Sequence, residues 1–166
     1  MNHRLERGDM ILVKGTKWYS KLISALTHSP YTHVAVHIHD GILLESDWNG
    51  VQASYIHKYA HIDYDVYRHT TATKEQLEDM VDKMLSKYGT GYDYLGIVGI
   101  AYSVFTGKEN KLDNKKRLWC SEYYADCALE SKIQLDVDSG THTYSPGDIS
   151  RDSNIIFICN KKDIVL

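Results

Sequence analysis

The chain has 166 residues, of which 43% are hydrophobic and 25% are charged, a composition typical of one globular domain covering 1–166. Its formal net charge of −3, from 19 basic and 22 acidic residues, provides no global basic field, so nucleic-acid binding is not expected. Two prolines and the lack of low-complexity runs argue against disorder or an internal linker.

Targeting and membrane signals are also absent from the sequence. The N-terminal stretch MNHRLERGDMILVKG has no apolar core of signal-peptide length before charged residues resume. The longest apolar stretch, YLGIVGIAYSVF at 94–105, is too short to cross a bilayer as a helix, so no integral membrane segment is expected. The three cysteines lack framework spacing, which fits a reducing compartment. These features predict a cytoplasmic protein, or one delivered by a route other than a cleaved signal.

The first elements predicted in chain order are a short strand and a helix. GDMILV at 8–13 is typical of a turn followed by a strand. Over 16–29, apolar residues recur at the spacing of an amphipathic helix, and Pro30 marks its end.

The clearest local signal is a β-hairpin in THVAVHIHDGILLES (32–46), where two runs of alternating apolar residues flank an Asp-Gly pair. A two-residue turn would place Val36 opposite Glu45. A three-residue loop over 39–41, with its glycine in the left-handed conformation, gives a bulged hairpin with Val36 opposite Leu44. We prefer the second register because it keeps one face apolar. Its pairs are Ile38 with Ile42, Val36 with Leu44, and Ala35 with Glu45.

The remaining elements complete an α+β pattern. In chain order we predict a strand over 64–70, a helix from the capping box of Thr73 and Gln76 to a stop at Gly89, a helix over 93–105, a charged loop over 107–117, a helix over about 120–131, a turn over 145–148 and a strand over 154–160. A few helices with about five or six short, mainly antiparallel strands predict a small sheet packed against helices.

Cys120, in KKRLWCSEYYADC (115–127), is the residue on which a functional interpretation depends. It could be half of a disulfide, a metal ligand, part of the core or a reactive thiol. A disulfide with Cys127 is excluded by helix geometry, because two turns separate the residues by roughly 10 Å of rise. A disulfide with Cys159 is disfavoured by the predicted compartment.

A metal site is the second alternative. His33, His37 and His39 alternate onto one strand face, and an HxH pair together with Cys120 can hold zinc. The sequence contains no CxxC, however, and histidines in such a hairpin are more often surface or cross-strand groups. We therefore expect no metal and no cofactor.

Core packing is the main alternative to a reactive thiol, because free cysteine is among the most buried residue types. Cys127 and Cys159 lie inside apolar periodic segments and are assigned to the core. Cys120 lies where a strand-like RLW ends and a helix begins. There the positive end of the helix dipole favours a thiolate, and free backbone N–H groups can bind an oxyanion.

A nucleophilic cysteine needs a base, and the base needs an acceptor that orients it. His33 begins its strand, where a side chain can reach over the end of a sheet. In the preferred register, Asp47 lies opposite His33, and Glu45 lies diagonally at about 7–8 Å between backbones, which a glutamate side chain can span. The register places both carboxylates on the face of His33.

Six segments in this order carry a family resemblance: GDMILVKG (8–15), SKLISALTHSPYTHVAVHI (20–38), DGILLES (40–46), YGTGYDYLGI (88–97), WCSEYYADC (119–127) and YSPGDIS (144–150). With them the chain resembles the circularly permuted branch of the NlpC superfamily of papain-like cysteine hydrolases, the YiiX/YebB-like group. In that group the histidine and the polar third residue precede the cysteine. The resemblance extends over most of the chain.

The resemblance implies a permuted papain-like fold and a set of site residues. Cys120 corresponds to the nucleophile at a helix N-terminus, His33 to the base, and Glu45, in preference to Asp47, to the third member of the triad. Tyr92 is a candidate substrate-binding residue of the cleft, and packing under the helix is an equally good interpretation of it.

The expected activity is hydrolysis of a small amide bond, by an amidase or peptidase, through a thioester on Cys120. The resemblance makes murein-type peptides and lipid amides the candidate substrates. Two other functions fit the same fold. One is a lipid acyltransferase or thioesterase, and the other is a module that binds a peptide or lipid without turnover.

Overall fold

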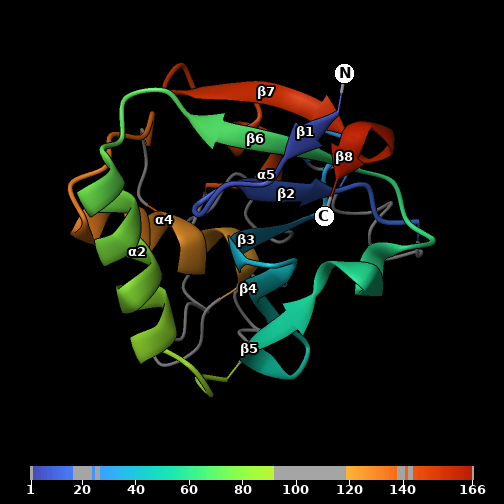
Figure 1. Ribbon diagram of the computed structural model, residues 1–166. Coiled ribbons are helices and arrows are strands. Elements are labelled where there is room, and N and C mark those ends of the chain that lie inside the picture. Colours follow the sequence, from blue (N-terminus) through green and yellow to red (C-terminus); the bar gives the residue numbers. More distant parts are fainter. Residues whose placement is uncertain are drawn as a thin grey trace, which may run out of the picture.

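The computed structural model describes residues 2–16, 24, 27–91, 119–137, 141 and 144–165 (Figure 1). Tyr92, the helix expected over 93–105 and the charged loop over 107–117 lie outside the described residues, as does most of the helix expected over 16–29. Within the described part of the chain, no helix is both long and apolar enough to cross a membrane.

A six-stranded antiparallel sheet forms the centre of the fold, in the order β5-β4-β3-β2-β6-β7. Its strands are β2 (Met10–Val13), β3 (His33–His39), β4 (Ile42–Asp47), β5 (Gly50–Tyr55), β6 (Tyr64–His69) and β7 (Ile155–Asn160). Two short strands near the termini, β1 (His3–Arg4) and β8 (Ile164–Val165), pair in parallel. The prediction of an α+β fold with a mainly antiparallel sheet is confirmed.

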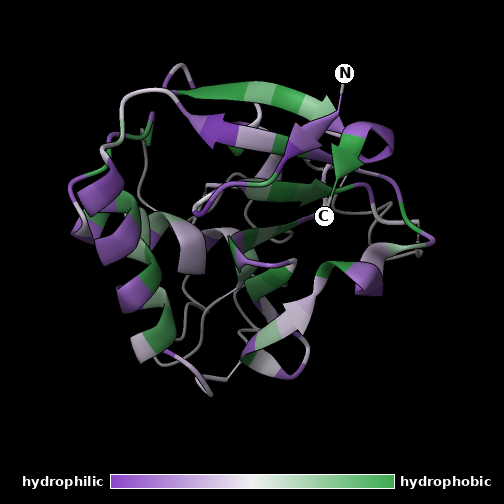
Figure 2. Cartoon of the chain, viewed as in Figure 1, coloured by the Kyte–Doolittle hydropathy of each residue, from purple (hydrophilic) through white to green (hydrophobic). Residues whose placement is uncertain are grey.

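Two longer helices, α2 (Lys74–Ser86) and α4 (Cys120–Glu130), pack against each other beside the sheet, and α4 also contacts β3 and β4 (Figure 1). The capping box predicted for α2 is present, because Thr73 and Gln76 exchange side-chain and backbone hydrogen bonds. Hydrophobic (green) and hydrophilic (purple) patches recur with each turn of α2, as in an amphipathic helix (Figure 2).

Three short helices complete the described elements: α5 (Pro146–Ile149) and the 3₁₀ helices η1 (Ile56–Tyr59) and η3 (Lys161–Asp163). The turn predicted over 145–148 is wrong in detail, because the chain forms the single helical turn α5 there. Ser145 and Asp148 make a reciprocal capping box, and the proline follows directly at the first helical position.

The hairpin of β3 and β4 has the faces that the sequence predicts. Val36 pairs with Leu44, and Ala35 pairs with Glu45. Because side chains alternate along a strand, this register puts the side chain of Glu45 on the same face as that of His33.

The turn of this hairpin differs from the prediction. Ile38 does not pair with Ile42; His39 takes that position, and the register shifts just before it. Asp40 and Gly41 form a two-residue turn with φ of 45° and 73°, the pair of positive values that suits the twist of the strands. A bulge then supplies the extra residue that the prediction had placed in the loop.

Apolar clusters cover both faces of the sheet. Residues of α2 and α4 cover one face, where they pack on alternate residues of the central strands such as Leu12, Val34 and Leu44. The intervening residues, such as Val13 and Ala35, point to the other face, where η1 contributes its buried residues. Glu45, which pairs with Ala35, lies on this second face and is completely buried.

The start of β5 is hydrogen-bonded to the segment that follows α2. Val51 N–H donates to the carbonyl of Thr90 (2.8 Å), and Gly89 N–H donates to the carbonyl of Val51 (2.9 Å). Gly50 has a φ of +93°, and a Cβ added there would lie 2.3 Å from the oxygen of Thr90. Gly50 therefore permits both the tight turn after β4 and the close approach of residues 89–91.

Replacing Gly50 with alanine should destabilise the fold more than the same change at Gly89. Gly89 has a φ of +82° with no atom near its added Cβ, so Gly89→Ala should cost only the left-handed backbone, about 1–2 kcal/mol. Gly50→Ala adds a clash with backbone, worth about 1–3 kcal/mol more. Urea unfolding of both variants measures the difference. Equal unfolding free energies would contradict the close approach at Gly50.

Candidate active site

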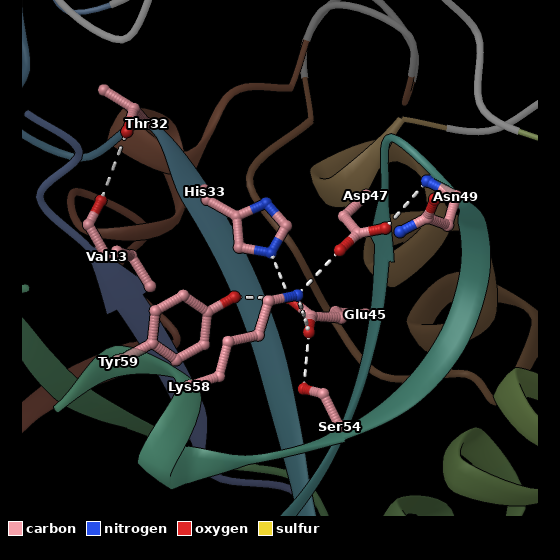
Figure 3. A network of polar contacts seen from close by, with 9 residues as sticks. All are labelled: Val13, Thr32, His33, Glu45, Asp47, Asn49, Ser54, Lys58 and Tyr59. Carbon is pink, nitrogen blue, oxygen red and sulfur yellow. Dashed lines mark hydrogen bonds and ion pairs between the residues drawn. The ribbon is translucent and has the colours of Figure 1, made fainter. Parts of the chain in front are cut away.

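The carboxylate of Glu45 is fully buried and accepts hydrogen bonds from four side chains (Figure 3). Its Oε2 lies 2.6 Å from Nε2 of His33 and also accepts the hydroxyl of Tyr59. Its Oε1 lies 2.5 Å from Oγ of Ser54 and 2.7 Å from Nζ of Lys58. Both oxygens are thus occupied by donors.

Three elements bring these donors to Glu45. In the β3–β4 register Ala35 lies opposite Glu45, so His33 lies two residues along the same face. On the other side β5 pairs Gln52 with Glu45, which puts Ser54 two residues along that strand. The 3₁₀ helix η1 follows β5 directly and carries Lys58 and Tyr59 (Figure 3).

The donors keep Glu45 ionised in spite of its surroundings. Burial alone would raise the pKa of the Glu45 carboxyl. The hydrogen bond and charge of His33, together with the hydrogen bonds of Lys58 and Ser54, instead hold this pKa far below its usual range. The ionised carboxylate of Glu45 can therefore orient the ring of His33 and stabilise its imidazolium form.

Cys120 is the first residue of α4 and is almost completely buried, with 3% of its surface exposed. The preceding Trp119 is the N-cap residue and makes no side-chain cap. The first N–H groups of a helix have no partner within the helix, so those at Cys120 can donate to an oxyanion.

The first turn of α4 is held in place by a buried polar chain. Ser121 Oγ donates to the carbonyl of Tyr144 (2.5 Å), and the Tyr144 hydroxyl donates to Oδ2 of Asp152 (2.5 Å). Asp152 also accepts the backbone N–H of Asp136 (2.7 Å). The residue next to Cys120 is thus fixed by contacts that do not involve the sheet.

His33 lies between Glu45 and Cys120. Burial would lower the pKa of His33, but the charge of Cys120 and a hydrogen bond to it, supported by Glu45, raise the pKa of His33 to about 10. Because Nε2 faces Glu45, Nδ1 is the ring nitrogen left to face the sulfur. This arrangement can hold an imidazolium beside a thiolate.

The structure thus brings together three of the predicted site residues: Cys120, His33 and Glu45. Asp47 is held apart from His33 by its own partners, since its Oδ2 lies 2.6 Å from Nζ of Lys58 and its Oδ1 accepts the N–H of Asn49. The geometry therefore favours Glu45 over Asp47 as the acceptor for the histidine. The catalytic roles of these residues remain predictions.

The two other histidines of the hairpin, His37 and His39, have partners outside this site. Gly41 N–H donates to Nε2 of His37 (3.2 Å), which leaves Nδ1 of His37 to donate to the carbonyl of Glu6 (2.9 Å). His39 is exposed, with Nδ1 3.3 Å from Asp40. No group of three or more His, Cys, Asp or Glu side chains in the described part of the chain is placed to hold a metal ion.

Sequence reasoning missed Ser54, Lys58 and Tyr59. Asn49-Gly50 is a hairpin signal that could have predicted β5, and with it the position of Ser54 opposite β4. Lys58 and Tyr59 reach Glu45 through the path of η1, for which the sequence carries no local signal.

Comparison with known proteins adds a fold relationship. No protein-family model matches the chain, and no curated protein matches it. The crystal structure of metalloprotein yiiX from Escherichia coli O157:H7, DUF1105, is similar, with a TM-score of 0.70 over 94% of this chain and 97% of that chain. The two sequences are 17% identical, so the likeness shows a shared fold.

Removing the charge of Glu45 should lower the pKa of His33, and removing that of Asp47 should change it much less. Glu45→Gln keeps the shape but loses an anion 2.6 Å from the ring, a change of about 1–3 pKa units. NMR titration of the His33 ring measures this, with Cys120→Ser in every protein so that the thiol does not titrate. Asp47→Asn is the matched control. A larger shift in Asp47→Asn would make Asp47 the partner of His33.

Proposed function

We propose that the protein is a cysteine hydrolase of the amidase or peptidase type, which cleaves a small amide bond through Cys120, His33 and Glu45. The observation that supports this most is the position of His33, bonded through Nε2 to a buried carboxylate and coupled on its other side to a thiol at a helix start. That is the order of groups that activates a cysteine nucleophile.

In the proposed reaction, His33 holds the proton of Cys120, and the sulfur attacks the amide carbonyl carbon. The developing oxyanion accepts hydrogen bonds from the backbone N–H of Cys120 and a neighbouring donor. The imidazolium gives its proton to the leaving nitrogen as the carbon–nitrogen bond breaks, which leaves a thioester. His33 then takes a proton from water as the water oxygen attacks the thioester. The carbon–sulfur bond breaks, the carboxylic acid leaves, and Cys120 with protonated His33 returns to the starting state.

Glu45 holds the ring of His33 in one orientation through all of these reaction steps. A carboxylate bonded to Nε2 directs Nδ1 to the sulfur and stabilises the imidazolium while it exists. The hydroxyls of Ser54 and Tyr59 keep the carboxylate in place without adding charge.

The resemblance to the permuted NlpC superfamily supports the same chemistry and suggests murein-type peptides or other small amides as substrates. The yiiX neighbour is a metalloprotein. In this chain the donors at Glu45 already occupy both carboxylate oxygens, so this residue does not fit a metal-ligand role, and no proposed step involves a metal.

The test is a panel of peptide amides and lipid amides incubated with the purified protein. Mass spectrometry should find a released amine and an acyl group attached to Cys120. Cys120→Ser should reduce release by about 10³-fold or more. Cys127→Ser, a buried cysteine two turns along the same helix, should retain activity.

Each other outcome has a definite meaning. Amine release that survives in Cys120→Ser, or that a strong chelator abolishes, would overturn thiol catalysis. Transfer of the acyl group to an added acceptor would instead indicate an acyltransferase. Binding of a panel member without release would indicate a module that binds and does not cleave.

A further inference from the structure

The ammonium group of Lys58 lies between two carboxylates that belong to a different element (Figure 3). Its Nζ is 2.7 Å from Oε1 of Glu45 and 2.6 Å from Oδ2 of Asp47. The Glu45 side chain is completely buried, that of Asp47 is 14% exposed, and that of Lys58 is 39% exposed. One partly exposed cation is therefore shared by two largely buried carboxylates.

The helix that carries Lys58 is itself anchored from a distant part of the chain. Nζ of Lys161 donates to the carbonyls of Tyr59 (3.0 Å), Ala60 and Ile62 (3.0 Å), so all three of its protons are used. The ammonium of Lys58 also lies 5.7 Å from the centre of the Tyr59 ring. The position of Lys58 is thus determined by the fold and not by its two carboxylates alone.

The described titratable groups around His33 come from three elements: Glu45 and Asp47 from β4, Lys58 and Tyr59 from η1, and Cys120 from α4. Burial, followed by the charge of Glu45, raises the pKa of Tyr59 far above its usual range, so this residue is neutral. Lys58 is therefore the cation among these groups that opposes the charge of the carboxylates.

A base that must also act as an acid needs a proton affinity that lets it do both. The bonded carboxylate of Glu45, with Asp47 on the other side of Lys58, favours the imidazolium form of His33. An imidazolium cannot take the proton from water that hydrolysis of the thioester requires. A cation between the carboxylates reduces their pull on the ring.

We propose that Lys58 is a positioning residue, the counter-ion of the Glu45–Asp47 pair, which keeps His33 able to release its proton. The effect of Lys58 on the proton affinity of His33 exists in the protein without substrate and does not depend on the proposed function. Its consequence for turnover, namely the pH range of the reaction, rests on the proposed function.

Lys58→Met tests this, because methionine keeps an unbranched side chain and removes the charge. Three effects then act in the same direction. Glu45 loses a competing donor, Asp47 loses its counter-ion, and the repulsion between the ammonium and the imidazolium disappears. We expect the pKa of His33 to rise by about one unit. NMR titration in the Cys120→Ser protein measures it without coupling to the thiol.

Two further variants separate charge from structure. Lys58→Arg retains the cation and should keep most of the wild-type behaviour. Lys14→Met is the matched control, because Lys14 is 34% exposed and also pairs with a buried carboxylate, 2.7 Å from Oδ2 of Asp65. It should leave the His33 titration nearly unchanged. No rise in Lys58→Met, or an equal rise in Lys14→Met, would overturn the proposal.

The activity arm keeps Cys120 and uses any amide that the wild type cleaves. Lys58→Met should move the optimum of turnover to higher pH, because hydrolysis of the thioester needs neutral His33, which then forms only at higher pH. Lys58→Arg should keep the wild-type optimum. If His33 shifts but no variant cleaves any amide, the proposed hydrolase function fails and the role of Lys58 stands. If cleavage occurs and neither His33 nor the pH profile shifts, the role of Lys58 alone fails.

Discussion

The burial of one carboxylate, that of Glu45 on β4, constrains how β3, β5 and η1 are arranged around it. An ionised carboxylate without partners is expensive to bury, and its cost is offset only when hydrogen bonds reach both oxygens. Here the donors come from β3, β5 and η1, so each element must lie where it does for the charge to be tolerated. The same contacts that satisfy Glu45 also fix the ring of His33.

The charges of the site form a continuous series from solvent to sulfur. Asp47 and Lys58 lie on the outer side, Glu45 is completely buried, and His33 joins Glu45 to Cys120. The sulfur is positioned independently, by the start of α4 and its link through Ser121. A rigid sheet and a separately held helix thus meet at the ring of His33, and a change on either side alters its proton affinity.

Features that depend on local sequence could be predicted, and features that depend on distant packing could not. The capping box of α2, the start of α4 and the faces of the first hairpin follow from side-chain chemistry and alternation. Alternation put both Glu45 and Asp47 on the face of His33, and the family resemblance favoured Glu45, which is the carboxylate that His33 contacts. The exact turn at Asp40-Gly41 was missed because a bulge and a longer loop give the same faces. Lys58 and Tyr59 were missed because only the path of η1, anchored by Lys161, brings them to Glu45.

The central claim is the proposal that His33, fixed by Glu45, holds the proton of Cys120 in the resting protein. The ultraviolet absorbance of the thiolate tests it most directly, because the signal does not require a probe to reach a buried sulfur. The difference between the wild type and Cys120→Ser should show a thiolate near neutral pH, and His33→Ala should remove it. A signal that appears only where an ordinary free thiol ionises, at about pH 8.5, and that is the same in His33→Ala would contradict the claim.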